Sequence, residues 1–129
     1  MDMVTLLRDF FRAVSFEPGG RPAYETIHGL FVPGGLLVKA VGAPEVSTVE
    51  QFIAPRLALV ESGALTEFHE SERSGETQQF GNVAQRWSVY DKRGVQDGTA
   101  FAAVGRISTQ FVRTPSGWLI TSMAWDDER

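Results

Sequence analysis

Apolar residues near the start of the chain recur with the period of an α-helix. The steps are of three and four residues, and arginine and aspartate lie largely opposite. The stripe comprises Val4, Leu7, Phe11 and Val14. The pattern predicts an amphipathic helix over residues 3–14 that packs on another layer of the protein.

Two further helices are predicted before residue 65. Pro22 suits the first turn of a short helix that ends near Gly29. Residues 47–50, Ser-Thr-Val-Glu, have the spacing of a capping box, in which the first side chain and the last satisfy each other's backbone amides. A third helix is therefore expected to start there and to end near Gly63, which suits a C-terminal cap.

From residue 65 onwards the pattern changes to the period of two that is typical of β-strands. Residues 83–90 form the clearest strand, because large and small or polar side chains alternate along it. Residues 101–113 form a strand long enough to need a bulge or a bend, for which Gly105 is the natural place. Residues 118–126 return as the last strand.

Two shorter segments complete the predicted sheet region. A short strand is expected over residues 36–41, and residues 91–98 read as a charged, glycine-containing loop. Helices first and antiparallel strands afterwards predict the α+β class, with the helices gathered on one face of a bent sheet.

The last strand is predicted to be apolar on both faces. One face would carry Trp118, Ile120 and Ala124, and the other Leu119, Met123 and Trp125. Because helices can cover only one face of an antiparallel sheet, this pattern predicts a homodimer that forms through the sheet.

Composition narrows the function classes. A chain of 129 residues, 43% hydrophobic and 22% charged, suits one domain over residues 1–129. The net charge of −4, without a segment of basic residues interleaved with aromatics, argues against nucleic acid as a partner. The apolar runs are too short to span a membrane, and the absence of cysteine together with an N-terminal segment unlike a signal peptide predicts a cytoplasmic protein.

Four segments carry a resemblance to a known family. They are Tyr24–Phe31, the GNVA of residues 81–84 that opens a strand ending in SVY at 88–90, the STQF of residues 108–111, and Trp118-x-Ile120-x-Ser122 through Trp125 to the acidic end. Together they resemble the nuclear transport factor 2-like superfamily and, more narrowly, small bacterial proteins of its SnoaL-like branch.

The resemblance implies a cystatin-like cone in which three N-terminal helices pack on a strongly curved, mixed but mainly antiparallel sheet. It also implies an apolar pocket between helices and sheet, and often a homodimer. The superfamily includes isomerases, dehydratases, hydrolases and non-catalytic carriers, so the resemblance predicts a fold more sharply than an activity.

The candidate catalytic residues are His28 and His69, because histidine is the common acid or base at neutral pH. The ordinary alternative is an exposed residue at a helix end for His28 and an unremarkable strand residue for His69. Other polar and aromatic side chains on elements expected to border the pocket are Tyr24, Arg86, Tyr90, Arg106, Gln110, Trp125 and Asp126. The two arginines have ion pairing across the sheet as their ordinary alternative.

These residues favour a small-molecule-binding domain of SnoaL-like type without assigned chemistry. Ketosteroid isomerase-like relatives use a carboxylate base on the strand after the second helix, and residues 36–40 contain no acid. No histidine spacing supports a metal site, and no cofactor is predicted. A lyase, isomerase or hydrolase with a histidine acid or base, and a non-catalytic protein-interaction module, are the alternatives, so the sequence leaves catalysis open.

Overall fold

The computed structural model describes residues 2–129 and begins with the predicted amphipathic helix, α1 (Met3–Val14). The Asp2 side chain caps it by accepting a hydrogen bond from the Thr5 amide at 2.8 Å. One face of α1 is buried in the core, through Leu6, Leu7, Phe10, Phe11, Ala13 and Val14. The helix therefore lies flat against the sheet, as its apolar stripe requires.

The second and third helices lie where they were expected but differ in detail. The second is a 3₁₀ helix, η1 (Tyr24–Leu30), and the third is α2 (Val49–Glu61). The capping box of α2 pairs Thr48 with Gln51, one residue later than the predicted box. Thr48 immediately precedes the first helical residue, Val49, so Ser47 lies one residue too early to be the N-cap.

Six strands form one sheet. They are β1 (Phe31–Lys39), β2 (Glu45–Thr48), β3 (Leu65–Phe80), β4 (Val83–Gln96), β5 (Thr99–Thr114) and β6 (Gly117–Asp127). Their order is β2-β1-β6-β5-β4-β3, with β1 and β6 parallel and every other pair antiparallel. The fold is therefore α+β with a mixed, mainly antiparallel sheet.

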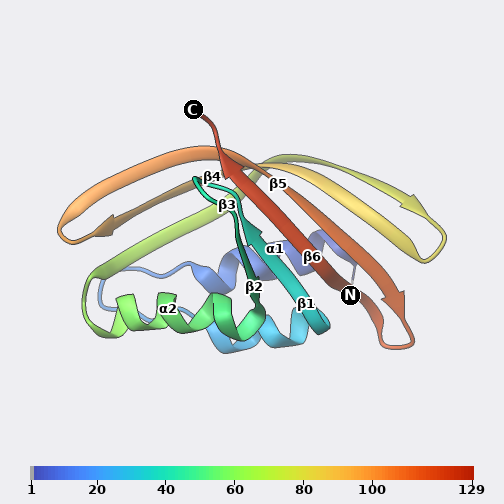
Figure 1. Cartoon of the computed structure of the whole chain (residues 1–129), viewed down its shortest axis with the longest axis horizontal. Coiled ribbons are helices and arrows are strands. Elements are labelled where there is room, and N and C mark those ends of the chain that lie inside the picture. The colour runs from blue at the N-terminus through green and yellow to red at the C-terminus, as the bar shows by residue number, and fades with distance from the viewer. Residues whose placement is uncertain (1) are drawn as a thin grey trace.

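The sheet curves over the helices. Figure 1 shows β3, β4 and β5 arching across the molecule, with α1 and α2 both on the concave side. The buried core lies in the same place, between α1, η1 and α2 and the concave face of the sheet. No helix within residues 2–129 is long and apolar enough to cross a membrane.

The predicted loop at residues 91–98 is wrong for most of its length. Strand β4 continues to Gln96, and only Asp97 and Gly98 form the turn to β5. Both turn residues have positive φ, 52° and 76°, as a tight two-residue hairpin requires. The predicted strand at 36–41 similarly starts earlier, at Phe31, and ends at Lys39.

Gly105 is not the site of a bulge. The pairing of β5 with β4 runs without interruption from Val83–Val112 to Gln96–Thr99. Gly105 instead lies opposite Tyr90, and a Cβ atom at position 105 would collide with the Tyr90 phenol. The glycine is needed because an aromatic side chain packs directly onto the backbone there.

The predicted division of the last strand into two apolar faces is also wrong. The register between β5 and β6 shifts at Gln110–Phe111, which leaves Thr121 as an extra residue in β6. Beyond this bulge the faces are exchanged, so that Ile120 and Met123 both enter the core and Trp125 packs against it. The outer face of β6 therefore carries Ser122 and Ala124 rather than a second run of large apolar residues.

Candidate functional site

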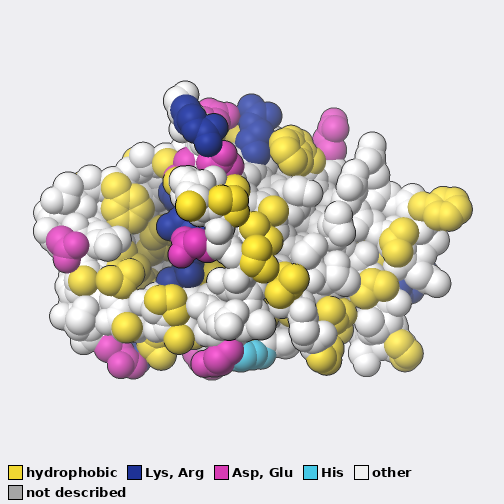
Figure 2. All heavy atoms as spheres, in the orientation of Figure 1, with side chains coloured by type: hydrophobic (Ala, Val, Ile, Leu, Met, Phe, Trp, Pro, Cys, Tyr) yellow, Lys and Arg dark blue, Asp and Glu magenta, His cyan; other side chains and the backbone are white. Residues whose placement is uncertain are grey.

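A cavity of about 340 Å³ lies between the helices and the concave face of the sheet. Figure 2 shows a hollow between α2 and the sheet in which basic and acidic side chains lie among apolar atoms. Residues of α1, η1, α2 and all six strands line the cavity. The principal lining residues are Phe10, Val14, Tyr24, Lys39, Glu45, Phe52, Arg56, Leu59, Phe68, Glu70, Tyr90, Lys92, Gln96, Phe101, Ile107 and Trp125.

Aromatic rings form much of the cavity wall. The ring of Phe52 on α2 lies 6.0 Å from that of Phe10 on α1 and 5.9 Å from that of Trp125 on β6, measured between ring centroids. The contact with Trp125 is edge-to-face, a favourable geometry for aromatic pairs. Because the three rings come from three elements, they fix the distance between the helices and the sheet at this end of the cone.

Two cationic side chains enter the cavity without an acidic partner. Arg56 reaches in from α2, donates through Nη1 to the Phe52 carbonyl oxygen at 2.9 Å, and stacks 3.7 Å from the centroid of the Phe52 ring. Burial lowers the pKa of the Arg56 guanidinium. Lys39 enters from the end of β1. Among residues 2–129, no carboxylate oxygen lies within 4.0 Å of either charged group.

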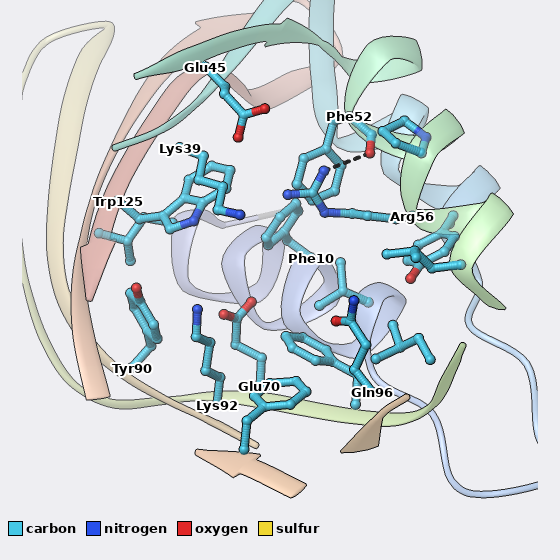
Figure 3. A pocket seen from close by; sticks show the side chains of 18 residues that line it. Phe10, Lys39, Glu45, Phe52, Arg56, Glu70, Tyr90, Lys92, Gln96 and Trp125 are labelled. Atoms are coloured by element: carbon cyan, nitrogen blue, oxygen red, sulfur yellow. Dashed lines mark hydrogen bonds between the residues drawn. The ribbon is translucent and has the colours of Figure 1, made fainter. Parts of the chain in front are cut away.

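Glu70 is the acidic group of the cavity floor. The β3–β4 register places it opposite Lys92, and Figure 3 shows both side chains pointing into the cavity side by side. Burial raises the pKa of the Glu70 carboxyl to about 7, against the opposing effects of Lys92 and Arg56. Asp127 raises this pKa further through charge repulsion. Glu70 is therefore poised to gain or lose a proton near neutral pH.

Lys92 forms its ion pair with Asp127 and not with Glu70. Its Nζ lies 2.7 Å from Asp127 Oδ2, and the Tyr90 hydroxyl donates to Asp127 Oδ1 at 2.6 Å. Burial and the hydrogen bond to Asp127 raise the pKa of Tyr90, so its hydroxyl stays protonated. This three-residue network holds the ammonium of Lys92 at Asp127. The Glu70 carboxyl group takes part in no ion pair or hydrogen bond within the described residues, although the Glu70 amide donates to Ser15 Oγ at 3.0 Å.

Three of the residues proposed from the sequence to line the pocket do line this cavity, namely Tyr24, Tyr90 and Trp125. Burial raises the pKa of Tyr24, which comes from η1. Tyr90 belongs to the floor network, and Trp125 belongs to the aromatic wall. The structure thus brings together these three aromatic side chains from elements far apart in the chain.

Neither histidine lies in the cavity. His28, at the end of η1, is 3.3 Å from Glu50 Oε2, and its side chain is 52% exposed. His69 precedes Glu70 on β3, so its side chain leaves the other side of the strand, where Nε2 lies 3.0 Å from Glu67 Oε2. The two histidines are thus separate surface or near-surface groups, and their proposed acid–base roles stay predictions.

The remaining proposed lining residues lie away from the cavity. Arg86 faces the helices but donates to both oxygens of Glu72, at 2.6 and 2.8 Å. Arg106 pairs with Glu128, and Asp126 with Arg129, both at exposed positions. Gln110 is exposed on the outer face of the sheet beside a shallow surface depression.

One cluster outside the cavity has ligand types that a metal ion could use. Ligand atoms of Glu17, Glu67 and His69 lie within 4.8 Å of one another. Glu67 is also 3.7 Å from Arg93, and the Glu17 side chain is 80% exposed. The cluster is accounted for as surface ion pairing.

The five charged residues of the cavity lining were not identified from the sequence: Lys39, Glu45, Arg56, Glu70 and Lys92. Lys92 carries a usable signal, because it is two residues beyond Tyr90 and therefore shares its face of the strand. Arg56 follows Pro55 on α2, and the apolar stripe of this helix does not indicate that the arginine side chain points into the cavity. Glu70 lies just before a break in the alternation of β3, at Glu72–Ser74, that hides its orientation.

Solved structures with this architecture cover almost the whole chain. A nuclear transport factor 2-like superfamily protein from Salmonella enterica serovar Typhimurium matches with a TM-score of 0.74 and 13% identity, covering 98% of this chain and 86% of that one. The chain has the nuclear transport factor 2-like fold. This assignment confirms the fold that the sequence resemblance implied.

Two further structures extend the nuclear transport factor 2-like comparison. An uncharacterized protein with a cystatin-like fold from Caulobacter vibrioides matches with a TM-score of 0.74 and 17% identity over 98% of this chain and 87% of that one. A ketosteroid isomerase-like protein from Erwinia carotovora atroseptica matches with a TM-score of 0.66 and 12% identity over 98% and 90%. No family model and no curated protein sequence matches the chain.

Proposed function

We propose that the chain binds a small, partly apolar molecule in the cavity between α1, α2 and the sheet. The observation that carries this proposal is an unfilled space of about 340 Å³ with aromatic walls and a few converging polar groups. That combination is typical of small-molecule sites. A filled interior would have favoured the alternative of a non-catalytic protein-interaction module.

A neutral apolar fluorophore, N-phenyl-1-naphthylamine, tests this proposal. We expect the purified protein to bind one molecule per chain, and Leu59→Trp, which fills the cavity from α2, to weaken binding at least tenfold. Leu119→Trp is the matched control, because Leu119 pairs with Val112 on the outer face of the sheet. Unaltered binding in Leu59→Trp, or no binding by the wild type, would refute the proposal.

A second candidate is an enzyme of this fold, a lyase, isomerase or hydrolase that acts on the bound molecule. The specific observation in its favour is a cavity carboxyl whose pKa is raised to about 7 by burial. If a substrate screen detects turnover, Glu70→Gln should reduce kcat at least a hundredfold. If a histidine is instead the acid or base, His28→Ala or His69→Ala should cause the reduction in kcat, and Glu70→Gln should not.

We also propose that a second copy of the chain covers the outer face of the sheet. The two apolar faces predicted for β6 do not exist, so they no longer support a dimer. The outer face of the sheet nevertheless exposes two large apolar side chains of β4, Trp87 by 54% and Val83 by 55%. Large apolar side chains that are half exposed on a broad sheet favour a self-complementary interface. Light scattering should give a dimer mass, and Trp87→Glu should give a monomer; a monomeric wild type at micromolar concentration contradicts the proposal.

The cytoplasmic location stays a prediction.

A further inference from the structure

We infer that the ligand is an amphipathic organic anion whose acidic group lies between Lys39 and Arg56, with its apolar body against the aromatic wall. The inference rests on the proposed binding function and specifies the ligand class. It assigns to these two residues an anion-binding role within the larger cavity.

The first support is the convergence of two like charges. Figure 3 shows the Lys39 ammonium, from β1, and the Arg56 guanidinium, from α2, pointing toward one another across the cavity. Neither has a carboxylate oxygen within 4.0 Å in the described part of the chain. Like charges that converge in a partly buried space repel each other, and an anion placed between them replaces the repulsion with two attractions.

The second support is the way Arg56 is held. The bond from Nη1 to the Phe52 carbonyl and the stacking on the Phe52 ring fix the plane of the guanidinium. No acceptor within hydrogen-bond distance is found for Nε or Nη2 among residues 2–129. A planar fork with two free donors matches the two oxygens of a carboxylate, or of a sulfonate or phosphate, and it is already oriented before the ligand arrives.

The acidic groups near the cavity do not cancel this positive charge. Asp127 is already neutralised by Lys92 and also accepts from Tyr90. Glu70 is only partly ionised near neutral pH, because burial raises its pKa to about 7. Glu45 lines the same end of the cavity from β2, and its charge opposes the lowering of the Arg56 pKa by burial. It is exposed to solvent, however, and its one negative charge faces the two positive charges of Lys39 and Arg56. The ligand-binding end of the cavity is therefore cationic at neutral pH.

Two fluorescent probes that differ in one group test the inference. 1-Anilinonaphthalene-8-sulfonate carries a sulfonate, and N-phenyl-1-naphthylamine has the same rings without it. Lys39→Met and Arg56→Met should each raise the Kd of the anionic probe about tenfold or more, since each removes a charge-assisted contact. The Kd of the neutral probe should change by less than about twofold.

Two further variants separate charge from packing. Arg56→Lys keeps the charge but loses the planar fork, so it should retain part of the affinity for the anionic probe. Arg106→Met removes an exposed cation on the outer face of the sheet and should change neither Kd. Because Lys39 takes part in no ion pair or stacking contact with residues 2–129, Lys39→Met decides the question if Arg56→Met proves too unstable to measure.

The outcomes distinguish the inference from the function on which it rests. Selective loss of the anionic probe supports an anion site formed by Lys39 and Arg56. Equal losses for both probes, or no loss for the anionic probe, overturn the anion site and leave the binding function intact. Failure of the wild type to bind the neutral probe overturns the binding function itself.

Discussion

Glu70 and Glu72 stand two residues apart on the same face of β3, yet their surroundings make them different acids. Glu72 accepts two hydrogen bonds from Arg86 and one from Ser88, which together lower the pKa of its carboxyl. Glu70 faces an unfilled cavity without such donors, and burial raises its pKa to about 7. The comparison shows that the partners supplied by the neighbouring strand, rather than the residue type, decide which carboxylate is structural and which can exchange a proton.

The largest expected difference is in the pH dependence of stability. Unfolded Glu70 titrates near 4.5 and folded Glu70 near 7, so between these values the folded state holds a proton that the unfolded state has lost. The contribution of Glu70 to the free energy of unfolding should therefore fall by about 3 kcal/mol as the pH rises from about 4.5 to about 7, and then level off. Urea denaturation at several pH values, with Glu70→Gln as the reference, measures this. Parallel curves for the two proteins would show that folding does not raise the pKa of Glu70.

The second prediction concerns the paired glutamate. Glu72→Gln should lower the free energy of unfolding by about 2 kcal/mol at pH 7, because Arg86 is only 12% exposed and loses its charged acceptor. Glu76→Gln is the matched control on the same strand, because Glu76 is exposed and should change stability by less than about 0.5 kcal/mol. Chemical denaturation at pH 7 checks both. Equal effects of the two substitutions would mean that the Glu72–Arg86 pair contributes nothing beyond a surface charge.

The smallest predicted effect is the contribution of Asp127 to the raised pKa of Glu70. Asp127→Asn should lower the Glu70 pKa towards its ordinary value, because it removes a nearby negative charge and frees Lys92 to approach Glu70. A carbon-13 NMR titration of the glutamate carboxyls follows the change. Asp91→Asn, whose partner Arg73 lies outside the cavity, should leave the Glu70 titration where it is.

Regular periodicity allowed the sequence to predict the framework of the fold. The stripe of α1 and the alternation of residues 83–90 are regular, so both elements are as predicted, although Val4 of the predicted stripe is exposed. The alternation did not indicate which face of the strand is buried, and the buried face is that of Ala84, Ser88 and Tyr90. The irregular positions were predicted wrongly. Thr121 is a bulge that exchanges the faces of β6. Adjacent Ser47 and Thr48 are equally good capping residues, so the sequence does not show which of them precedes the first helical residue. Local pattern does not reveal which residue a neighbouring strand leaves unpaired.

The candidate site was harder to predict than the fold. Histidines were chosen because a free imidazole titrates near neutral pH, whereas the near-neutral group of the cavity is a glutamate, Glu70. Its pKa depends on burial and on the distance to Lys92 and Asp127, and these depend on three strands together. Tyr90 and Trp125 were proposed because they lie on strands expected to border the pocket, and both do line the cavity.

The contact between Gly105 and Tyr90 has a consequence for the size of molecule the protein can accept. With no side chain at position 105, the phenol lies close against β5, and the space above it belongs to the cavity. A methyl group at this position would lift the ring away from the sheet and shorten the space available to a ligand. The absence of a side chain at position 105 therefore helps to keep the cavity at its present volume, because any larger residue there would displace the Tyr90 ring.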